Sequence, residues 1–210
     1  MARFRDHSGF LMLELLMAMT VMSIALTALV TVFSAGLLTM RRASQETTAS
    51  FLADIQLETY RAMTSKDIGL DLSAGTVSAL DSNYTNDTAC ANSGAGTTCA
   101  ANGVSGTETG PTGATPDTCT QINAWYPNTL PCTPSRTISS STTPASPDGR
   151  SYRVDTYIVQ LPATTGTNAQ RAVKQVTVVV RDSSNLTSYL ARESSVFDCS
   201  TGITPNSTDC

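Results

Sequence analysis

The sequence predicts an α+β fold: a long N-terminal α-helix packed on a small antiparallel sheet, with long loops stapled by disulfide bonds. Three observations predict it. The 26-residue segment Leu15 to Met40 has no charged residue, and a helical pattern continues beyond it. The last third of the chain alternates apolar and polar residues, as strands do. Residues 88–150 between them are mostly Gly, Ser, Thr, Ala, Pro and Asn, a composition typical of loops.

The N-terminal helix is long enough to cross a membrane. At about 1.5 Å per residue, Leu15 to Met40 spans roughly 39 Å, whereas a bilayer core is about 30 Å thick. A cleaved secretory signal has an apolar region of only about 7–15 residues, so this segment is too long for one. Neither Gly nor Pro occurs from residue 43 to 64, and Phe51 and Ile55 lie one turn apart there. We therefore expect one helix from Phe10 to Met63, whose amphipathic second half covers the sheet with the Phe51 and Ile55 stripe.

The beginning of this helix carries a short motif, Gly9-Phe10-x-x-x-Glu14, after a short basic leader. The motif, the leader and the long apolar helix resemble the processing signature of type IV pilins and type II secretion pseudopilins. The resemblance implies that a membrane prepilin peptidase cuts between Gly9 and Phe10, and that Phe10 becomes an N-methylated N-terminus. It also implies that Glu14 pairs with the N-terminal amine of a neighbouring subunit during assembly, which would compensate a costly buried carboxylate. The alternative for Glu14 is an interfacial residue that reaches the lipid headgroups.

The partners implied by the resemblance are prepilin peptidase, other pilin or pseudopilin subunits, an inner-membrane assembly platform and the membrane itself. The expected function is that of a filament subunit, a minor pilin or pseudopilin, because the apolar stretch lacks the proline common in major pilins. One alternative is a minor pilin at the tip that binds a surface or takes up DNA. A more distant alternative is a monomeric membrane-anchored extracytoplasmic domain.

Composition bears on the other classes of protein. The chain of 210 residues has a net charge of −4 and no run of basic residues, which argues against a nucleic-acid binder. Its only histidine, His7, lies in the expected leader, and no common catalytic motif occurs. We therefore expect neither an enzyme nor a bound cofactor. The segment from Asp81 to Asp87 faintly resembles a calcium loop but lacks the required glycine and glutamate, so we expect no metal site.

The cysteines are Cys90, Cys99, Cys119, Cys132, Cys199 and Cys210, all on one side of the apolar segment. Their even number favours disulfides in an oxidising compartment, and the short spacings favour pairing of neighbours, 90 with 99, 119 with 132 and 199 with 210. Zinc, the rival, normally requires closer spacing or histidine partners. Because basic residues flank the apolar segment equally, the cysteines decide the topology. The N-terminus is then cytoplasmic and the C-terminal domain extracytoplasmic, on the cell surface or in the periplasm after assembly.

The C-terminal strands are expected at 151–161, 173–181 and 186–197. In the first, Tyr152, Val154 and Ile158 share a face; in the second, the valines at 176, 178 and 180 do. Trp125 and Tyr126 are expected to cover the core, or else to form a short strand or mark a binding surface. The predicted organisation is a leader (1–9), a membrane and filament-core helix (10–40), an amphipathic continuation (41–64), a loop-rich region (65–150) and a sheet with a terminal cysteine loop (151–210).

Overall fold

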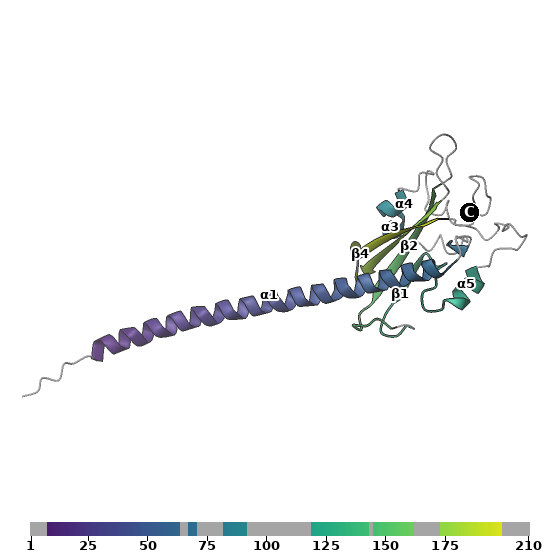
Figure 1. Cartoon of the computed structure of the whole chain (residues 1–210). Helices are drawn as coiled ribbons and strands as arrows, with labels where there is room; N and C mark the ends of the chain where they lie inside the picture. Colours follow the sequence, from purple (N-terminus) through teal and green to yellow (C-terminus); the bar gives the residue numbers. More distant parts are fainter. Residues whose placement is uncertain are drawn as a thin grey trace, which may run out of the picture. The chain divides into compact units, whose positions relative to one another are not determined.

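The computed structural model of the chain describes residues 8–63, 67–70, 82–91, 119–142, 145–161 and 173–198. It divides into two compact units, Met1–Ser44 and Gln45–Cys210. Helix α1, Ser8–Ala62, contributes to both and is drawn as one unbroken coil (Figure 1). Its 55 residues contain no proline, and Gly36 costs only some local helix propensity. The long helix predicted from the sequence is therefore confirmed.

The second unit is built on a four-stranded antiparallel sheet in the order β1-β2-β3-β4. The strands are β1 (Ser135–Ile138), β2 (Tyr152–Leu161), β3 (Val173–Asp182) and β4 (Asn185–Asp198). The three strands expected from alternation are confirmed, but β1 was missed. It is four residues long and buries only Ile138 fully, so its sequence shows too few alternations to be recognised.

The turn between β3 and β4 fixes the register of this hairpin. Ser183 and Ser184 separate the strands, as the polar run at this point predicts. One carboxylate oxygen of Asp182 accepts hydrogen bonds from the Ser184 hydroxyl, at 2.6 Å, and from the Ser184 N–H, at 2.8 Å. These bonds stabilise the charged carboxylate and lower the pKa of Asp182.

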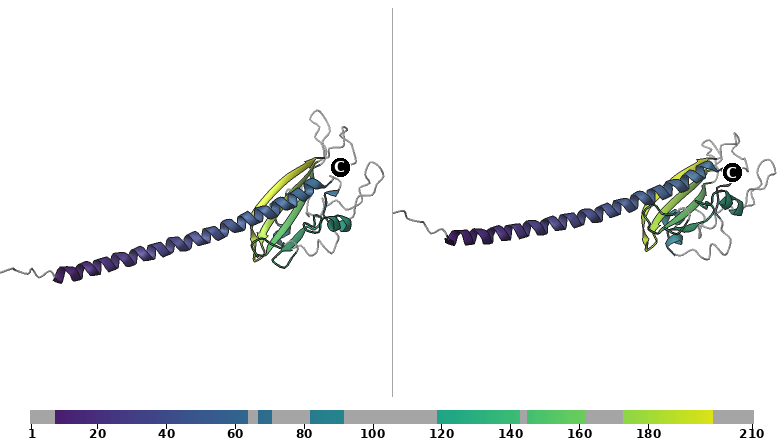
Figure 2. Two further views of the ribbon diagram at one scale, coloured as in Figure 1. Left: turned by 60° about the horizontal axis from the view of Figure 1, so that its bottom comes forward. Right: turned by 90° about the horizontal axis from the view of Figure 1, so that it is seen from below.

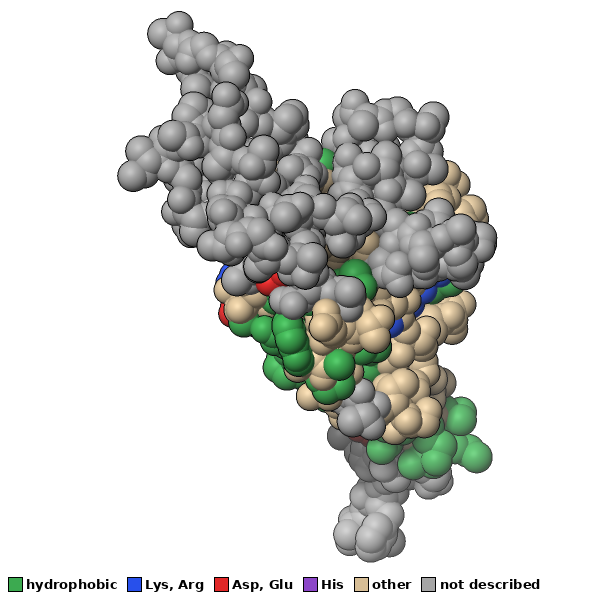
Figure 3. Space-filling view, turned by 90° about the vertical axis from the view of Figure 1, so that its right-hand side faces the viewer, with side chains coloured by type: hydrophobic (Ala, Val, Ile, Leu, Met, Phe, Trp, Pro, Cys, Tyr) green, Lys and Arg blue, Asp and Glu red, His purple; other side chains and the backbone are tan. Residues whose placement is uncertain are grey.

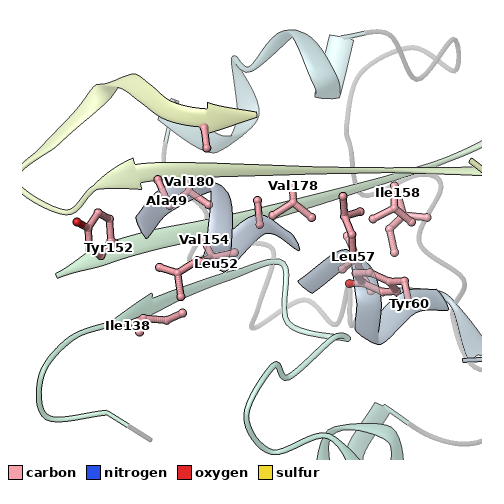
Figure 4. Close-up of a cluster of buried hydrophobic side chains, with 14 of the residues drawn as sticks. Ala49, Leu52, Leu57, Tyr60, Ile138, Tyr152, Val154, Ile158, Val178 and Val180 are labelled. Atoms are coloured by element: carbon pink, nitrogen blue, oxygen red, sulfur yellow. The ribbon is translucent and has the colours of Figure 1, made fainter. Parts of the chain in front are cut away.

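One face of the sheet packs against the second half of α1, which crosses the strands in both views of Figure 2. The close-up in Figure 4 shows helix and strand side chains meeting in this core. The expected strand residues take part: Tyr152, Val154, Ile158, Val176, Val178 and Val180. The helix contributes Ala49, Leu52, Ala53, Leu57 and Tyr60.

The prediction that Phe51 and Ile55 of α1 cover the sheet was wrong. Phe51 is 52% exposed and Ile55 is half-buried, whereas Leu52 and Ala53 are buried. The packed stripe is thus offset by about one residue from the expected one. Ala49 and Ala53 explain why the helix packs with this side on the sheet, because small side chains let the helix backbone approach the sheet closely.

The other face of the sheet is covered by two short helices, α3 (Ser82–Thr85) and α4 (Thr88–Ala91). Tyr84 of α3 stacks on Tyr157 of β2 with ring centroids 4.4 Å apart. The Tyr84 hydroxyl donates to the Thr156 carbonyl oxygen at 2.6 Å, and the Tyr157 hydroxyl donates to the Tyr84 carbonyl oxygen at 3.2 Å. Burial raises the pKa of both phenols, which stay neutral at physiological pH.

Candidate functional site

The N-terminal motif lies in the first turns of α1. Because the helix begins at Ser8, Gly9 and Phe10 occupy its opening turn, and the side chain of Glu14 follows one turn after Phe10. Glu14 is exposed. A cut before Phe10 would therefore create a cationic amine within about one helical turn, roughly 6 Å along the axis, of this carboxylate.

The helix surface that follows Glu14 is apolar on all sides and exposed. Val32 and Met40 are 72% exposed, Phe33 is 70% exposed, and the most apolar part of the helix buries none of its residues. Soluble monomers rarely expose so large a continuous apolar surface. Among the described residues, α1 is the one helix long and apolar enough to cross a membrane.

The hydroxyl groups in this apolar stretch find acceptors within the helix. Each donates to a backbone carbonyl oxygen three or four residues earlier, at 2.7–3.3 Å. These residues are Thr20, Ser23, Thr27, Thr31, Ser34 and Thr39. Such bonds remove the cost of placing hydroxyls in an apolar medium. Between Met12 and Met40, Glu14 is then the polar group whose charge still needs compensation.

A second exposed feature lies on the second half of α1, on the side turned away from the sheet. An open groove of about 660 Å³ is lined by Phe51, Ile55 and Ala62, by the carboxylates Asp54 and Glu58, and by Tyr126. Tyr126 follows helix α5 (Cys119–Trp125). The space-filling view shows hydrophobic side chains gathered on the described surface of this end of the domain (Figure 3).

The α5 region departs from expectation at its tryptophan. Trp125 is 59% exposed, so it does not cover the core, and Ile122 is the buried residue of α5. Tyr126 is half-buried. Its N–H donates to the Ile122 carbonyl oxygen at 3.0 Å, and its own carbonyl oxygen accepts from the N–H of Leu130 at 2.9 Å. The aromatic pair therefore lies at the surface on a hydrogen-bonded turn.

This turn is tied to α1 by polar contacts. The Tyr60 hydroxyl donates to the Pro131 carbonyl oxygen. Arg136 of β1 donates to the Gln56 side-chain oxygen at 3.1 Å and to the Asn128 carbonyl oxygen at 2.8 Å. Burial lowers the pKa of Arg136 to about 10, which still leaves it charged at neutral pH. The groove therefore has walls that are fixed to each other.

A buried network of charges lies on the face of the sheet opposite α1. Arg181 pairs with both Asp155 and Asp87, and all three are almost fully buried. Arg153 donates to Asp155 at 2.8 Å, and Arg192 pairs with Asp87 at 3.2 Å. Burial alone would lower the pKa of Arg181, but its anionic partners and Tyr157 raise it overall.

This network was not predicted, although the sequence held a signal for it. Arg153, Asp155 and Arg181 interrupt strands that are otherwise rich in β-branched residues, at positions facing away from the α1 core. The basic residues Arg153, Lys174 and Arg181 do not form a basic patch on the described surface of the sheet. Arg153 and Arg181 are buried in ion pairs, and Lys174 is buried on the other face, where it donates to the Ile68 carbonyl oxygen at 3.0 Å.

The network also accounts for the acidic segment that resembles a calcium loop. One Asp87 oxygen pairs with Arg181, and the other accepts from Arg192 and from the Ala89 N–H at 2.8 Å. Both oxygens therefore have cationic or N–H donors. Asp81 lies outside the described residues.

Two of the six cysteines have described side chains. Cys119 begins α5 and is half-buried, and Cys132 is buried near β1. The structure does not show the expected disulfide between them. Cys90 lies in α4 without a described side chain, and Cys99, Cys199 and Cys210 lie outside the described residues. The disulfide pairing stays a prediction.

The chain matches no protein-family model, and searches of curated proteins and of solved structures find no similar protein.

Proposed function

We propose that this chain is a membrane-inserted filament subunit of the pilin or pseudopilin kind, processed before Phe10 and assembled through α1. The observation that carries the proposal is the continuous helix, whose first part exposes apolar side chains on every side and whose second part packs on a sheet. The Gly9-Phe10-x-x-x-Glu14 motif at its beginning supplies the processing step.

The mechanism uses one apolar surface in two environments. Before assembly, the surface from Met12 to Met40 lies in the lipid bilayer, where its hydroxyls are satisfied by the helix backbone. On assembly the same surface packs against helices of other subunits. The contact is heterologous, so each added subunit offers a new surface, and an open polymer results.

Glu14 gives the assembly step its specificity. A carboxylate in an apolar medium is costly unless a cation compensates it, and the amine of a processed Phe10 on a neighbouring subunit is such a cation. Processing is then required for assembly, because an uncut chain has no amine at this depth. A membrane anchor alone would need neither the cut nor the pairing.

Assembly of Glu14 variants tests this proposal. The full chain is expressed with a prepilin peptidase, and the fraction in sedimentable filaments is measured for wild type, Glu14→Gln and Glu14→Leu. Removing one partner of a buried ion pair costs about 3–5 kcal/mol, so both variants should lose more than about 100-fold in assembly. Glu46→Gln is the control, because Glu46 is an exposed carboxylate elsewhere on the same helix.

The outcome separates assembly from anchoring. Glu14→Leu makes the helix more apolar, so an anchor would keep or improve membrane insertion with this variant. Loss of filaments with insertion intact therefore supports the proposal. Filaments at wild-type level in Glu14→Leu, or no filaments in wild type, would leave a monomeric membrane-anchored domain as the better description.

A further inference from the structure

The groove on the outer side of α1 combines apolar residues with negative charge. Phe51, Ile55 and Tyr126 are the large apolar side chains that line it. Phe51 is 52% exposed and makes no part of the α1 core. Phe51 and Ile55 lie on one side of the helix together with the carboxylates Asp54 and Glu58, and Tyr126 lines the groove from the turn after α5.

A third carboxylate lies next to Asp54, one of the residues that line the groove. Glu193 of β4 lies beside Asp54. Burial raises the pKa of Glu193, and its hydrogen bond with Asp54 raises it further. Among the described residues at this end of the helix, Arg61 is a cation, and it pairs with Glu58. Among the described residues that line the groove, the charged ones are Asp54 and Glu58, and both are acidic.

A matching surface occurs earlier on the same helix. Arg41 and Arg42 are exposed, and the structure shows no ion pair for either among the described residues. Leu37 and Leu38 are about half exposed, and Met40 is 72% exposed. The segment from Leu37 to Arg42 thus presents apolar side chains followed by two cations, the complement of an apolar groove with acidic residues.

The two surfaces are well separated along α1. Arg41 and Asp54 are 13 positions apart on one helix, which separates them by about 20 Å along its axis. A second, parallel copy displaced along the axis by 13 to 16 positions, about 20–24 Å, brings its Arg41 and Arg42 opposite Asp54 and Glu58.

We propose that this groove binds the Leu37–Arg42 segment of α1 from a second copy of the chain. The apolar side chains fill the groove, and the arginines lie beside Asp54 and Glu58. The inference rests on the proposed filament function and adds the register of one contact in it. The neighbour concerned differs from the one that pairs with Glu14, because Glu14 needs an offset of only about four residues.

Site-specific photo-cross-linking tests the proposal in the full chain. Phe51 is replaced by p-benzoylphenylalanine in one tagged copy, which is co-expressed with prepilin peptidase and a second copy bearing another tag. Irradiation of the filaments should join the two tags, and mass spectrometry should place the cross-link between residues 33 and 45 of the second copy. The same replacement at Tyr189, which is 59% exposed on β4, is the matched control and should give no cross-link to that segment.

Exchanging the charges of Asp54 and Arg41 tests whether ion pairs contribute to the proposed contact. Asp54→Arg alone, or Arg41→Glu alone, should lower the yield of the Phe51 cross-link by about threefold or more, because each turns an attraction into a repulsion. The double variant, which exchanges the two charges, should recover at least half of the wild-type yield. A purely structural effect of either substitution would not be rescued in this way.

The N-terminal mass of the same samples distinguishes the failure of this inference from that of the proposed function. If the chain begins at Phe10 and forms filaments, but Phe51 cross-links to another protein, to another part of the second copy, or to nothing, the groove inference is overturned and the filament function stands. If the chain is not cut before Phe10 and no filament forms, both are overturned.

Discussion

Replacing Arg181 by methionine should destabilise the domain by about 3 kcal/mol, because the change leaves two buried carboxylates without their shared cation. Arg181 is 4% exposed and pairs with Asp155, which is fully buried, and with Asp87. Breaking one buried pair costs about 3–5 kcal/mol. The lower end applies here, because each carboxylate keeps other donors.

The donors that remain explain why the expected loss for Arg181→Met is near the lower end of this range. Asp155 keeps Arg153 at 2.8 Å and the hydroxyl of Ser135 at 2.6 Å. Asp87 keeps Arg192 at 3.2 Å. The control is Arg192→Met, which removes one contact of a side chain that is 27% exposed, and should cost about 1 kcal/mol or less.

Urea unfolding of the full chain in detergent micelles measures both variants. The near-ultraviolet circular dichroism of the buried tyrosines Tyr60, Tyr84, Tyr152 and Tyr157 reports the packing of this domain. With a slope of about 2 kcal/mol per molar urea, Arg181→Met should lower the midpoint by about 1.5 M and Arg192→Met by about 0.5 M or less. Adding Asp155→Asn to Arg181→Met should recover part of the loss, since one uncompensated charge is removed. Equal shifts for the two arginine variants, or no recovery, would refute the assignment of the network as a coupled buried unit.

Two further predictions concern the pH dependence of stability and a turn that holds a glycine at positive φ. Glu193 has a raised pKa in the folded state, so its contribution to stability is full below its ordinary value near 4.5 and is lost as the pH rises through the folded-state pKa. Glu193→Gln should therefore be more stable than wild type at pH 7, by a few tenths of a kcal/mol for such a partly exposed pair, with the difference vanishing near pH 4 in thermal unfolding. Gly149 adopts a positive φ of 73° in the turn before β2, which favours glycine, so Gly149→Ala should lower stability by about 1 kcal/mol. Gly36→Ala is its control, because a Cβ at Gly36 meets no atom within 4 Å and alanine favours the helix; an equal loss in both would contradict the backbone argument.

The parts of the fold that follow from local patterns could be predicted from the sequence. The absence of proline and the apolar run predict α1 to within two residues at either end. Alternation at Val176, Val178 and Val180 predicts the buried face of β3, and the polar turn after it predicts the hairpin. In each case the residues that predict the element are close together in the chain, so the local sequence is enough to predict it.

The parts that depend on packing between distant segments could not be predicted. Two stripes of the second half of α1 are apolar, one through Leu52 and one through Phe51, and only the close approach allowed by Ala49 and Ala53 selects the first. The pairing of Arg181 with Asp87 joins residues 94 positions apart, and the sequence around either residue does not indicate its partner. The groove could not be predicted for the same reason, because it is lined by Phe51 and Ile55, which lie on the side of the helix that does not pack on the sheet.

The central claim is that a cut before Phe10 turns a membrane helix into an assembling one. The most direct measurement is the N-terminal mass of the full chain, expressed with a prepilin peptidase, for wild type and for Gly9→Ala. We predict a wild-type chain that begins at Phe10 with the mass of an N-methyl group added, and an uncut chain for Gly9→Ala. A wild-type chain that keeps Met1, or one cut within the helix near Ala35, would contradict the account.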